Sequence, residues 1–534
     1  MIINPVLKGF NPDPSICRVD DDYYIAVSTF EWFPGVGIFH SKDLINWRLI
    51  CRPLNRVSQL DMRGNPDSGG VWAPCLTYSD GQFWLIYSDV KVTGDTWKDT
   101  YNYLVTSDTI DGVWSEPIFL NGSGFDPSLF HDDDGKKWLV NMAWDHRTYM
   151  HRFYGIVLQE YDHKAKKLVG EKKIIYKGTD LGLTEAPHLY KINGYYYLLV
   201  AEGGTRYEHA AVFARSRHIW GPYETHPEPY MLTSYYHPQI ELQKAGHASI
   251  VETQDGQWYM AHLTGRPIKP DWIMMLEDRG FCPLGRETAI QKLYWENDWP
   301  YVVGGNQPSV EVESPGYAEQ KWERDYPVKD DFDSDRLNHH FQTLRVPFNQ
   351  ELGSLTERKG YLRLYGRESL NSLFTQSLVA RRWQCLDFTA ETKVEFCPTT
   401  FQQQAGLVCY YNTKNWTTFH ITLNEQGQRV LDLMTSDRQT VSNPLGRGQI
   451  VIPEHVCGVY LRVVVTAKSY RFSYSFDDVD FVEVPIQFDS YKLSDDYIRE
   501  TAFFTGAFVG IHCMDTSGMR QHADFDYFIY RENS

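Results

Sequence analysis

Two aspartates, each placed directly before a proline, are the first residues in the sequence whose type and setting suggest acid–base chemistry. Asp13 lies in Asn11-Pro12-Asp13-Pro14-Ser15, and Asp126 lies in Gly124-Phe125-Asp126-Pro127-Ser128. Proline disfavours the helical region for the residue before it, so we expect both aspartates to be extended and to lead into strands. A single aspartate of this kind is usually structural, but two copies at the starts of strands could hold two carboxyl groups close together.

The segments that these aspartates open belong to a repeat. Five segments each contain a start residue, a short apolar run, a polar turn and a closing aromatic residue. The start residues are Asp13, Trp72, Asp126, Glu185 and His247, and the closing aromatics are Tyr24, Trp84, Trp138, Tyr197 and Tyr259. Repeated β-rich units of this length predict a propeller, here with five blades. Because equivalent blades surround one axis, the five start residues should line the central channel, where propellers bind ligands.

The length of the chain and its patterning predict two domains, both of them all-β. A chain of 534 residues exceeds one ordinary core. The five repeats occupy residues 1–305, and the aperiodic stretch 306–325, which follows Gly304-Gly305, is expected to be a linker. Residues 326–534 contain alternating strands such as Glu391-Thr392-Lys393-Val394-Glu395-Phe396 and no helical pattern, which is typical of a β-sandwich.

The composition and the sequence pattern argue against several classes of binding partner and structural site. A net charge of −17 argues against nucleic acid and against anionic membrane surfaces. No stretch approaches the length of a membrane-spanning helix, and the N-terminal residues lack the pattern of a signal peptide. The 9 cysteines are scattered, without a Cys-x-x-Cys pair, so neither a disulfide framework nor a zinc site is indicated. A cytoplasmic location is therefore expected.

Carboxylic acids and aromatic side chains around one channel suit glycoside hydrolysis. That reaction needs a proton donor for the leaving oxygen and a carboxylate that acts as nucleophile or as base for water. Trp72, Phe30 and Phe125 could stack on the apolar faces of sugars, although packing between blades would also explain them. A lectin-like propeller that binds glycans without cleaving them is the alternative, and it would need the aromatics without a placed acid and base.

Four motifs together resemble glycoside hydrolase family 43. They are the two aspartate motifs, Thr184-Glu185-Ala186-Pro187-His188-Leu189, and Gly285-Arg286-Glu287-Thr288. Within the family, the sequence resembles the two-domain β-xylosidases over its whole length, including Phe503-Phe504-Thr505-Gly506-Ala507-Phe508 in the C-terminal domain.

This resemblance implies an inverting, exo-acting hydrolase that removes xylose from the non-reducing end of β-1,4-xylo-oligosaccharides such as xylobiose. Asp13 would be the general base, Glu185 the general acid, and Asp126 the carboxylate that orients the acid and raises its pKa. Arg286 would bind hydroxyls of the terminal sugar, unless it only pairs with a surface acid. The sandwich would supply Phe503 or Phe504 to close the pocket.

The resemblance also leaves a second activity open and implies an oligomeric state. An α-L-arabinofuranosidase, or an enzyme with both activities, is the alternative within the family. Related enzymes imply a homo-oligomer, namely a tetramer. No cofactor is expected to be required. His247 could be a core histidine, a residue of the site floor that tunes Asp13, or a ligand to calcium through water, although calcium prefers oxygen ligands.

Overall fold

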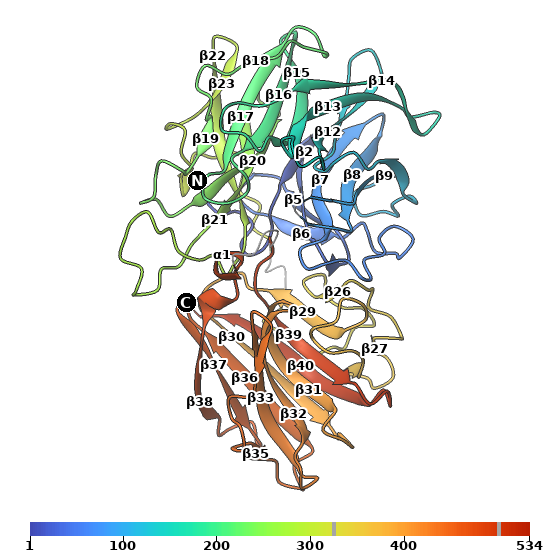
Figure 1. Cartoon of the computed structure of the whole chain (residues 1–534), viewed down its shortest axis with the longest axis vertical. Coiled ribbons are helices and arrows are strands. Elements are labelled where there is room, and N and C mark those ends of the chain that lie inside the picture. Colours follow the sequence, from blue (N-terminus) through green and yellow to red (C-terminus); the bar gives the residue numbers. More distant parts are fainter. Residues whose placement is uncertain (95, 323–326, 499–503, 534) are drawn as a thin grey trace.

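The computed structural model describes residues 1–94, 96–322, 327–498 and 504–533. Five antiparallel sheets arranged around one axis form the upper part of the molecule in Figure 1. The inner strands of neighbouring sheets pack against one another in a closed ring, in the order β2, β7, β11, β15, β20 and back to β2. The blades, each given from its inner to its outer strands, are β2(Ser15–Val19)-β3(Asp22–Val27)-β5(Gly37–Ser41)-β6(Arg48–Cys51); β7(Gly70–Ser79)-β8(Gln82–Val90)-β9(Thr100–Ser107)-β10(Ile118–Asn121); β11(Ser128–His131)-β12(Lys137–Trp144)-β13(Phe153–Asp162)-β14(Lys167–Tyr176); β15(Glu185–Ile192)-β16(Tyr195–Glu202)-β17(Ala210–Ser216)-β18(Glu224–Thr225), with β19(Leu232–Thr233) also on β17; and β20(Gln243–Glu252)-β21(Trp258–Gly265)-β22(Glu287–Glu296)-β23(Trp299–Val302). The predicted five-bladed propeller is confirmed.

The repeat in the sequence corresponds to the register of the blades. Each closing aromatic lies on the second strand of its blade, directly opposite a residue of the inner strand; the pairs are Cys17 with Tyr24, Thr77 with Trp84, Phe130 with Trp138, Tyr190 with Tyr197, and Val251 with Tyr259. The common spacing therefore places the five start residues at equivalent positions near the axis.

The backbone at the start residues departs from a regular strand. The ladder between the first and second strands shifts register in three blades, between Trp72 and Cys75, between Glu185 and His188, and between Gly246 and Ala248. Such bulges turn a side chain out of the regular pleat, and they are common beside active sites.

The prediction of an extended backbone at Asp13 and Asp126 is wrong. Asp13 has φ +58° and Asp126 has φ +54°, so both lie in the left-handed region and precede their strands. Aspartate tolerates this region better than most residues. The proline rule describes only local steric contacts, and tertiary hydrogen bonds to both carboxylates, described below, offset the cost of the unusual conformation.

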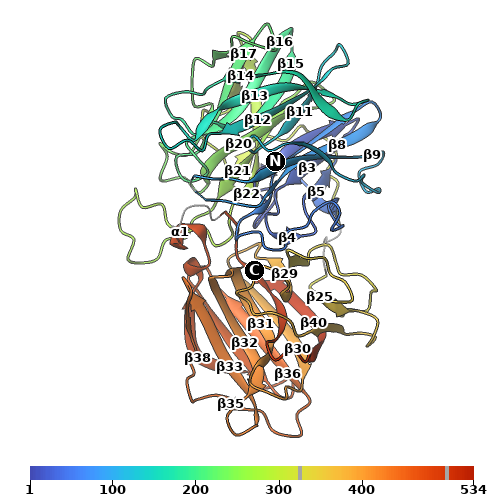
Figure 2. The same ribbon diagram turned by 45° about the vertical axis from the view of Figure 1, so that its right-hand side comes forward.

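The lower domain is a sandwich of two antiparallel sheets, which Figure 2 shows from the side. One sheet has the order β27(Gly353–Ser354)-β28(Leu362–Tyr365)-β40(His522–Glu532)-β30(Phe388–Phe396)-β36(Gly458–Val465)-β37(Ser469–Ser475)-β38(Val482–Asp489), with β25(Lys329–Asp330) on β40. The other has the order β34(Thr440–Ser442)-β33(Arg429–Asp437)-β32(Asn415–Leu423)-β31(Gln403–Asn412)-β39(Phe508–Asp515)-β29(Ser377–Arg382)-β26(Gln342–Leu344)-β4(Trp32–Phe33), with β35(Ile450–Val451) on β33. Apolar side chains from both inner faces form one core, so the predicted β-sandwich is confirmed.

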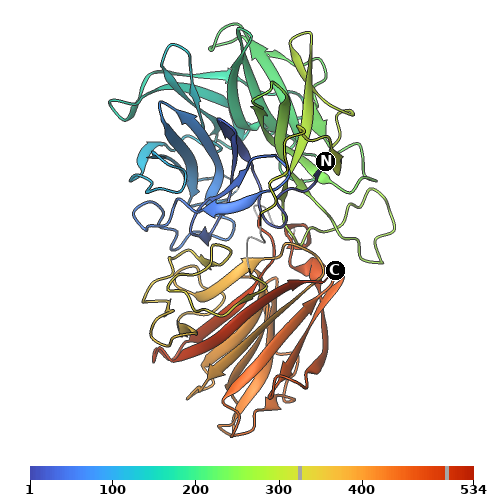
Figure 3. The same ribbon diagram turned by 180° about the vertical axis from the view of Figure 1, so that it is seen from behind.

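A strand of the propeller sequence completes one sheet of the sandwich. β4 pairs with β26, with Trp32 opposite Leu344 and Phe33 opposite Thr343. Trp32 is fully buried and stacks on Phe508 with ring centroids 3.6 Å apart. The two domains therefore share a sheet and an apolar contact, and the back view in Figure 3 shows the same close junction.

Part of the stretch expected to be a linker, residues 306–325, contacts the N-terminus. β24(Glu311–Val312) pairs with β1(Ile2–Ile3), and the Asn4 amide donates to the carbonyls of Ile290 and Ser309. These contacts tie the first residues of the propeller to its last blade. Within the described ranges, none of the helices is long and apolar enough to cross a membrane.

Candidate active site

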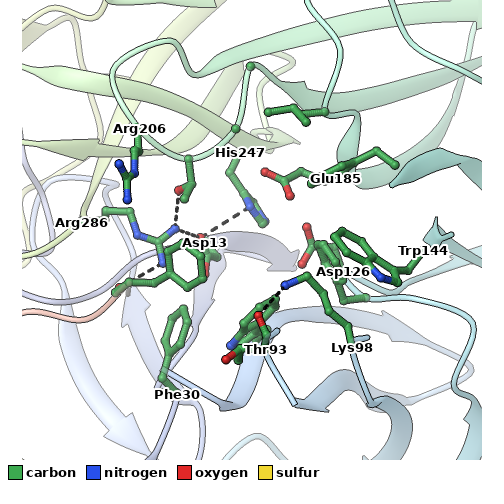
Figure 4. A pocket seen from close by; sticks show the side chains of 18 of the residues that line it. Asp13, Phe30, Thr93, Lys98, Asp126, Trp144, Glu185, Arg206, His247 and Arg286 are labelled. Atoms are coloured by element: carbon green, nitrogen blue, oxygen red, sulfur yellow. Dashed lines mark hydrogen bonds and ion pairs between the residues drawn. The ribbon is translucent and has the colours of Figure 1, made fainter. Parts of the chain in front are cut away.

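All five start residues line one pocket near the propeller axis, and Figure 4 labels four of them, Asp13, Asp126, Glu185 and His247. Its volume of about 410 Å³ lies in the range of small-molecule sites. The other residues predicted for the site that line it are Phe30, Phe125, Arg286 and Phe504. Phe503, the alternative to Phe504, lies outside the described residues.

Asp13 is a buried carboxylate held by three neighbours. The hydroxyl of Ser28 donates to its Oδ2 at 2.6 Å, and Nη1 of Arg286 donates to its Oδ1 at 3.0 Å. Nδ1 of His247 is 3.5 Å from the same Oδ1. Burial alone would raise the pKa of Asp13, but the charges of Arg286 and His247 and the hydrogen bond from Ser28 outweigh it, and the pKa is lowered. Asp13 is therefore ionised near neutral pH, as a general base must be.

Glu185 has the opposite protonation behaviour. Its side chain keeps some exposed surface because it faces the pocket, yet protein surrounds it. This burial, with the added charge of Asp13, raises the pKa of Glu185 to about 8, although Arg286 and Lys98 act in the other direction. A carboxyl with this pKa carries a proton at pH 7, so Glu185 can act as a general acid.

Asp126 contacts the strand that carries the acid. Its Oδ2 accepts a hydrogen bond of 3.1 Å from the backbone N–H of Ala186, the residue after Glu185. Burial and the charges of Glu185 and Asp13 raise the pKa of Asp126 well above its usual range. Ionisation of either carboxyl, Asp126 or Glu185, therefore disfavours ionisation of the other.

Arg286 connects the base to the wall of the pocket. Besides Asp13, its Nη1 reaches Oγ1 of Thr205 at 2.7 Å, and its Nη2 donates to the carbonyl of Phe504 at 3.2 Å. The preceding Gly285 has φ +72°, and a Cβ there would lie 2.8 Å from the Thr505 carbonyl. Glycine therefore allows the sandwich segment to approach the arginine.

His247 lines the pocket beside Asp13. Burial lowers its pKa, so it is neutral near pH 7 despite the nearby carboxylate. In the described part of the chain, no three His, Cys, Asp or Glu side chains come together in a group that could hold a metal ion directly. A calcium ion bound through water near His247 stays a prediction.

Aromatic side chains form the walls. Trp72 lies with its ring centroid 5.3 Å from that of Phe125 and 5.5 Å from that of Phe504, both in edge-on geometry. Phe30 lies 6.0 Å from Trp72 and 6.1 Å from Phe504. The wall is apolar and continuous, which suits the carbon-bound face of a pyranose ring.

Sequence reasoning missed several lining residues, of which Lys98, Trp144 and Arg206 are labelled in Figure 4. Nζ of Lys98 lies 4.7 Å from the ring centroid of Trp144 and 5.6 Å from that of Trp72. Lys98 belongs to the connection between β8 and β9, and Trp144 ends β12, so neither occupies the repeated start position. The Gly203-Gly204 pair after β16 was a turn signal that could have directed attention to Thr205, which follows it.

The arrangement combines an ionised carboxylate, a protonated carboxyl and an arginine inside an apolar pocket. An ionised base can deprotonate water, and a protonated acid can donate to a leaving oxygen. These are the two groups that hydrolysis of a glycoside with inversion requires.

Comparison with known proteins agrees with this geometry. Residues 2–300 match the model of glycosyl hydrolases family 43, and residues 329–531 match that of the beta xylosidase C-terminal concanavalin A-like domain. The chain is 62% identical to a beta-xylosidase of Bacillus subtilis over 99% of both chains. It is 51% identical to xylosidase/arabinosidase 43B of Humicola insolens, over 99% of this chain and 97% of that protein.

A solved structure shows the same fold over the whole length. The crystal structure of a xylan beta-1,4-xylosidase from Bacillus halodurans superposes with a TM-score of 0.96, at 52% identity and with 100% of both chains covered. The family match spans the propeller that carries the pocket, and the full-length relatives include the sandwich. The chain therefore belongs to glycosyl hydrolases family 43 and is a glycoside hydrolase.

Proposed function

We propose that this enzyme is an exo-acting β-xylosidase that releases xylose, with inversion, from the non-reducing end of β-1,4-xylo-oligosaccharides. The observation that carries the proposal is the opposite protonation of Asp13 and Glu185 in one apolar pocket. The names of the two relatives and of the similar structure support xylose as the sugar, and the name of the structure supports the β-1,4 linkage.

The chemistry follows from the two carboxyl groups. Asp13 removes a proton from a water molecule as its oxygen attacks the anomeric carbon. Glu185 gives its proton to the glycosidic oxygen as the bond from that oxygen to the anomeric carbon breaks. Direct attack inverts the configuration, so a β-xyloside yields α-xylose first. Asp126 orients the acid through its contact with Ala186 and, by repulsion, favours the protonated form of Glu185.

Exo action requires a pocket that is closed at one end, and we propose that the sandwich closes this one. The sandwich contributes Phe504 to the lining of the pocket, so we expect only a chain end to enter. Arg286 lies beside Asp13 and is placed to bind hydroxyls of the terminal sugar.

The test is hydrolysis of xylobiose and xylotetraose, followed by proton NMR and chromatography. We expect α-xylose as the first anomer and xylose as the first product from both substrates. Early xylobiose from xylotetraose would mean endo action, and β-xylose as the first anomer would mean that Asp13 is not the base of an inverting reaction.

Activity on arabinofuranosides is the second candidate function, because one relative is named for both activities. Comparing kcat/KM for the nitrophenyl glycosides of β-xylose and α-L-arabinofuranose measures it directly. A larger value for the arabinofuranoside would overturn the assignment of xylose as the main substrate.

We further propose that catalysis needs no metal, because the carboxyl groups and Arg286 supply the proton transfers and the charge that the reaction uses. Dialysis against EDTA, with metal analysis of the dialysed protein, should leave kcat/KM within about twofold. A loss that calcium restores would instead support the ion near His247.

We also propose that the protein is cytoplasmic and that it forms a homo-oligomer. The cysteines in the described residues are all free thiols, which suits the reducing cytoplasm. A homo-oligomer is supported by the loop between β21 and β22, where the exposed fractions of Trp272, Met274 and Met275 are 62%, 91% and 64%. Light scattering after size exclusion would show whether the assembly is a tetramer.

A further inference from the structure

Ser68, a residue outside the pocket lining, makes polar contacts to two of the pocket's aromatic residues. It is fully buried in the connection before β7, with φ +58°. Its hydroxyl oxygen accepts a hydrogen bond of 3.0 Å from the backbone N–H of Phe504. Its carbonyl accepts one of 2.7 Å from the indole N–H of Trp72, and its own N–H donates to Oε2 of Glu31 at 3.1 Å.

The contact with Phe504 crosses between the domains. Phe504 precedes β39 of the sandwich, yet the described hydrogen bonds to its peptide groups come from the propeller: Ser68 accepts from its N–H, and Arg286 donates to its carbonyl. The ring that these bonds place lies against Trp72 and Phe30 in the wall of the pocket. The propeller therefore determines where this ring of the sandwich lies.

The residue before Ser68 fixes the same connection to the sandwich. Asp67 is buried and pairs with Nη2 of Arg345 at 3.0 Å, and the hydroxyl of Thr413 donates to its Oδ2 at 2.5 Å. Arg345 is itself almost fully buried and also donates to the carbonyl of Asn65. Because Arg345 and Thr413 of the sandwich both hold Asp67, the hydroxyl of the adjacent Ser68 has a defined position at the junction of the domains.

We propose that Ser68 is a positioning residue for substrate binding: its hydroxyl holds Phe504 so that the aromatic ring completes the wall that contacts the terminal sugar. The inference rests on the proposed xylosidase function, since it assumes that a sugar occupies this pocket. A contact with the wall is made in the ground state and the transition state alike, so its loss should raise KM and leave kcat nearly unchanged.

The test compares Ser68→Ala and Ser68→Gly with the wild-type enzyme on xylobiose. Both changes remove the hydroxyl, and glycine also suits the positive φ, so a shared effect is not caused by backbone strain. An unpaired buried N–H is costly enough that we expect KM to rise about tenfold. Ser490→Ala is the matched control: Ser490 is equally buried and donates to a carbonyl, but it lies in the sandwich away from the pocket. Its kinetics should equal those of the wild type.

A double-mutant cycle shows whether Ser68 acts through Phe504. In the Phe504→Ala background the ring is already gone, so adding Ser68→Ala should change KM by less than about twofold. Additive effects, an unchanged KM in both Ser68 variants, or a fall in kcat alone would overturn the proposal. Wild-type turnover of xylobiose, measured in the same experiment, tests the proposed function separately.

Discussion

Asp13 and Glu185, two carboxyl groups in one pocket, take different protonation states because their neighbours differ. Asp13 has a hydroxyl, an arginine and a histidine around it, whereas Glu185 has burial and a nearby negative charge. The roles of base and acid therefore follow from positions in the fold and not from residue type, since aspartate and glutamate alone have similar pKa values.

Substrates with different leaving groups should distinguish the role of Asp13 as base from that of Glu185 as acid. Asp13→Ala removes the group that deprotonates water, so turnover should fall by several orders of magnitude for every substrate. Glu185→Ala removes the proton donor, which matters only when the departing oxygen is basic. An aryl xyloside with an acidic phenol should therefore retain far more activity than xylobiose in Glu185→Ala, with no such gap in Asp13→Ala. Equal losses on both substrates in Glu185→Ala would contradict its role as acid.

The dependence of kcat/KM on pH should report the ionisation of both Asp13 and Glu185. Activity should be lost as pH rises through about 8, where Glu185 gives up its proton, and as pH falls below the usual range of aspartate, where Asp13 becomes protonated. Lys98 lowers the pKa of Glu185 and is not among the main influences on the pKa of Asp13, so Lys98→Met should move the alkaline limb up and move the acid limb much less.

Asp126→Asn is the matched comparison for that profile. The two carboxyls disfavour each other's ionisation, so replacing that of Asp126 by a neutral amide should ease ionisation of Glu185 and move the alkaline limb down. Movement of both variants in the same direction would contradict the assignment of the alkaline limb to Glu185.

At the scale of elements, the start of each inner strand and the domain junction position the site. The short helix α1(Asp495–Ile498) lies against β20 through a buried ion cluster. Nζ of Lys244 is 2.8 Å from Asp496 and 3.4 Å from Asp495, and its side chain has no exposed surface. Asp496 also accepts from the backbone N–H of Cys282, so one carboxylate contacts both β20 and the connection between β21 and β22.

Removing the lysine should destabilise the junction. Lys244→Met leaves two buried carboxylates without their cation, which typically costs about 3–5 kcal/mol. We expect a clearly lower Tm in calorimetry. Lys468→Met is the control, because its ion pair with Asp271 also connects the domains but is well exposed, at 67% and 85% of the two side chains. Equal changes of Tm in the two variants would show that burial of the Lys244 cluster does not matter.

At the scale of the whole molecule, the propeller depends on the sandwich for both stability and activity. Deleting residues 326–534 would expose the buried face around Trp32 and Phe10, which contact Phe508, and would remove Phe504 from the pocket. We expect a protein that aggregates or binds a hydrophobic dye and that hydrolyses xylobiose poorly. A soluble propeller with the kcat/KM of the full chain would show that the sandwich is not part of the active site.

The repeat, the fold class and the set of residues at the axis could be predicted from the amino-acid sequence alone. This was possible because the spacing between a start residue and its closing aromatic is local and is copied in every blade, and because Asp13, Asp126 and Glu185 occupy that repeated position. Arg286 lies outside the repeat and was found through its motif.

The remaining residues of the site, and the protonation of its carboxyl groups, could not be predicted in this way because they depend on the folded structure. Ser68, Lys98 and Trp144 lie on connections or strand ends that carry no periodic signal. The left-handed backbone of Asp13 depends on partners that are distant in the chain, and so does its low pKa, because burial and charge are set by residues up to 273 positions away. Phe504 reaches the pocket from another domain, since hydrogen bonds across the junction place it there.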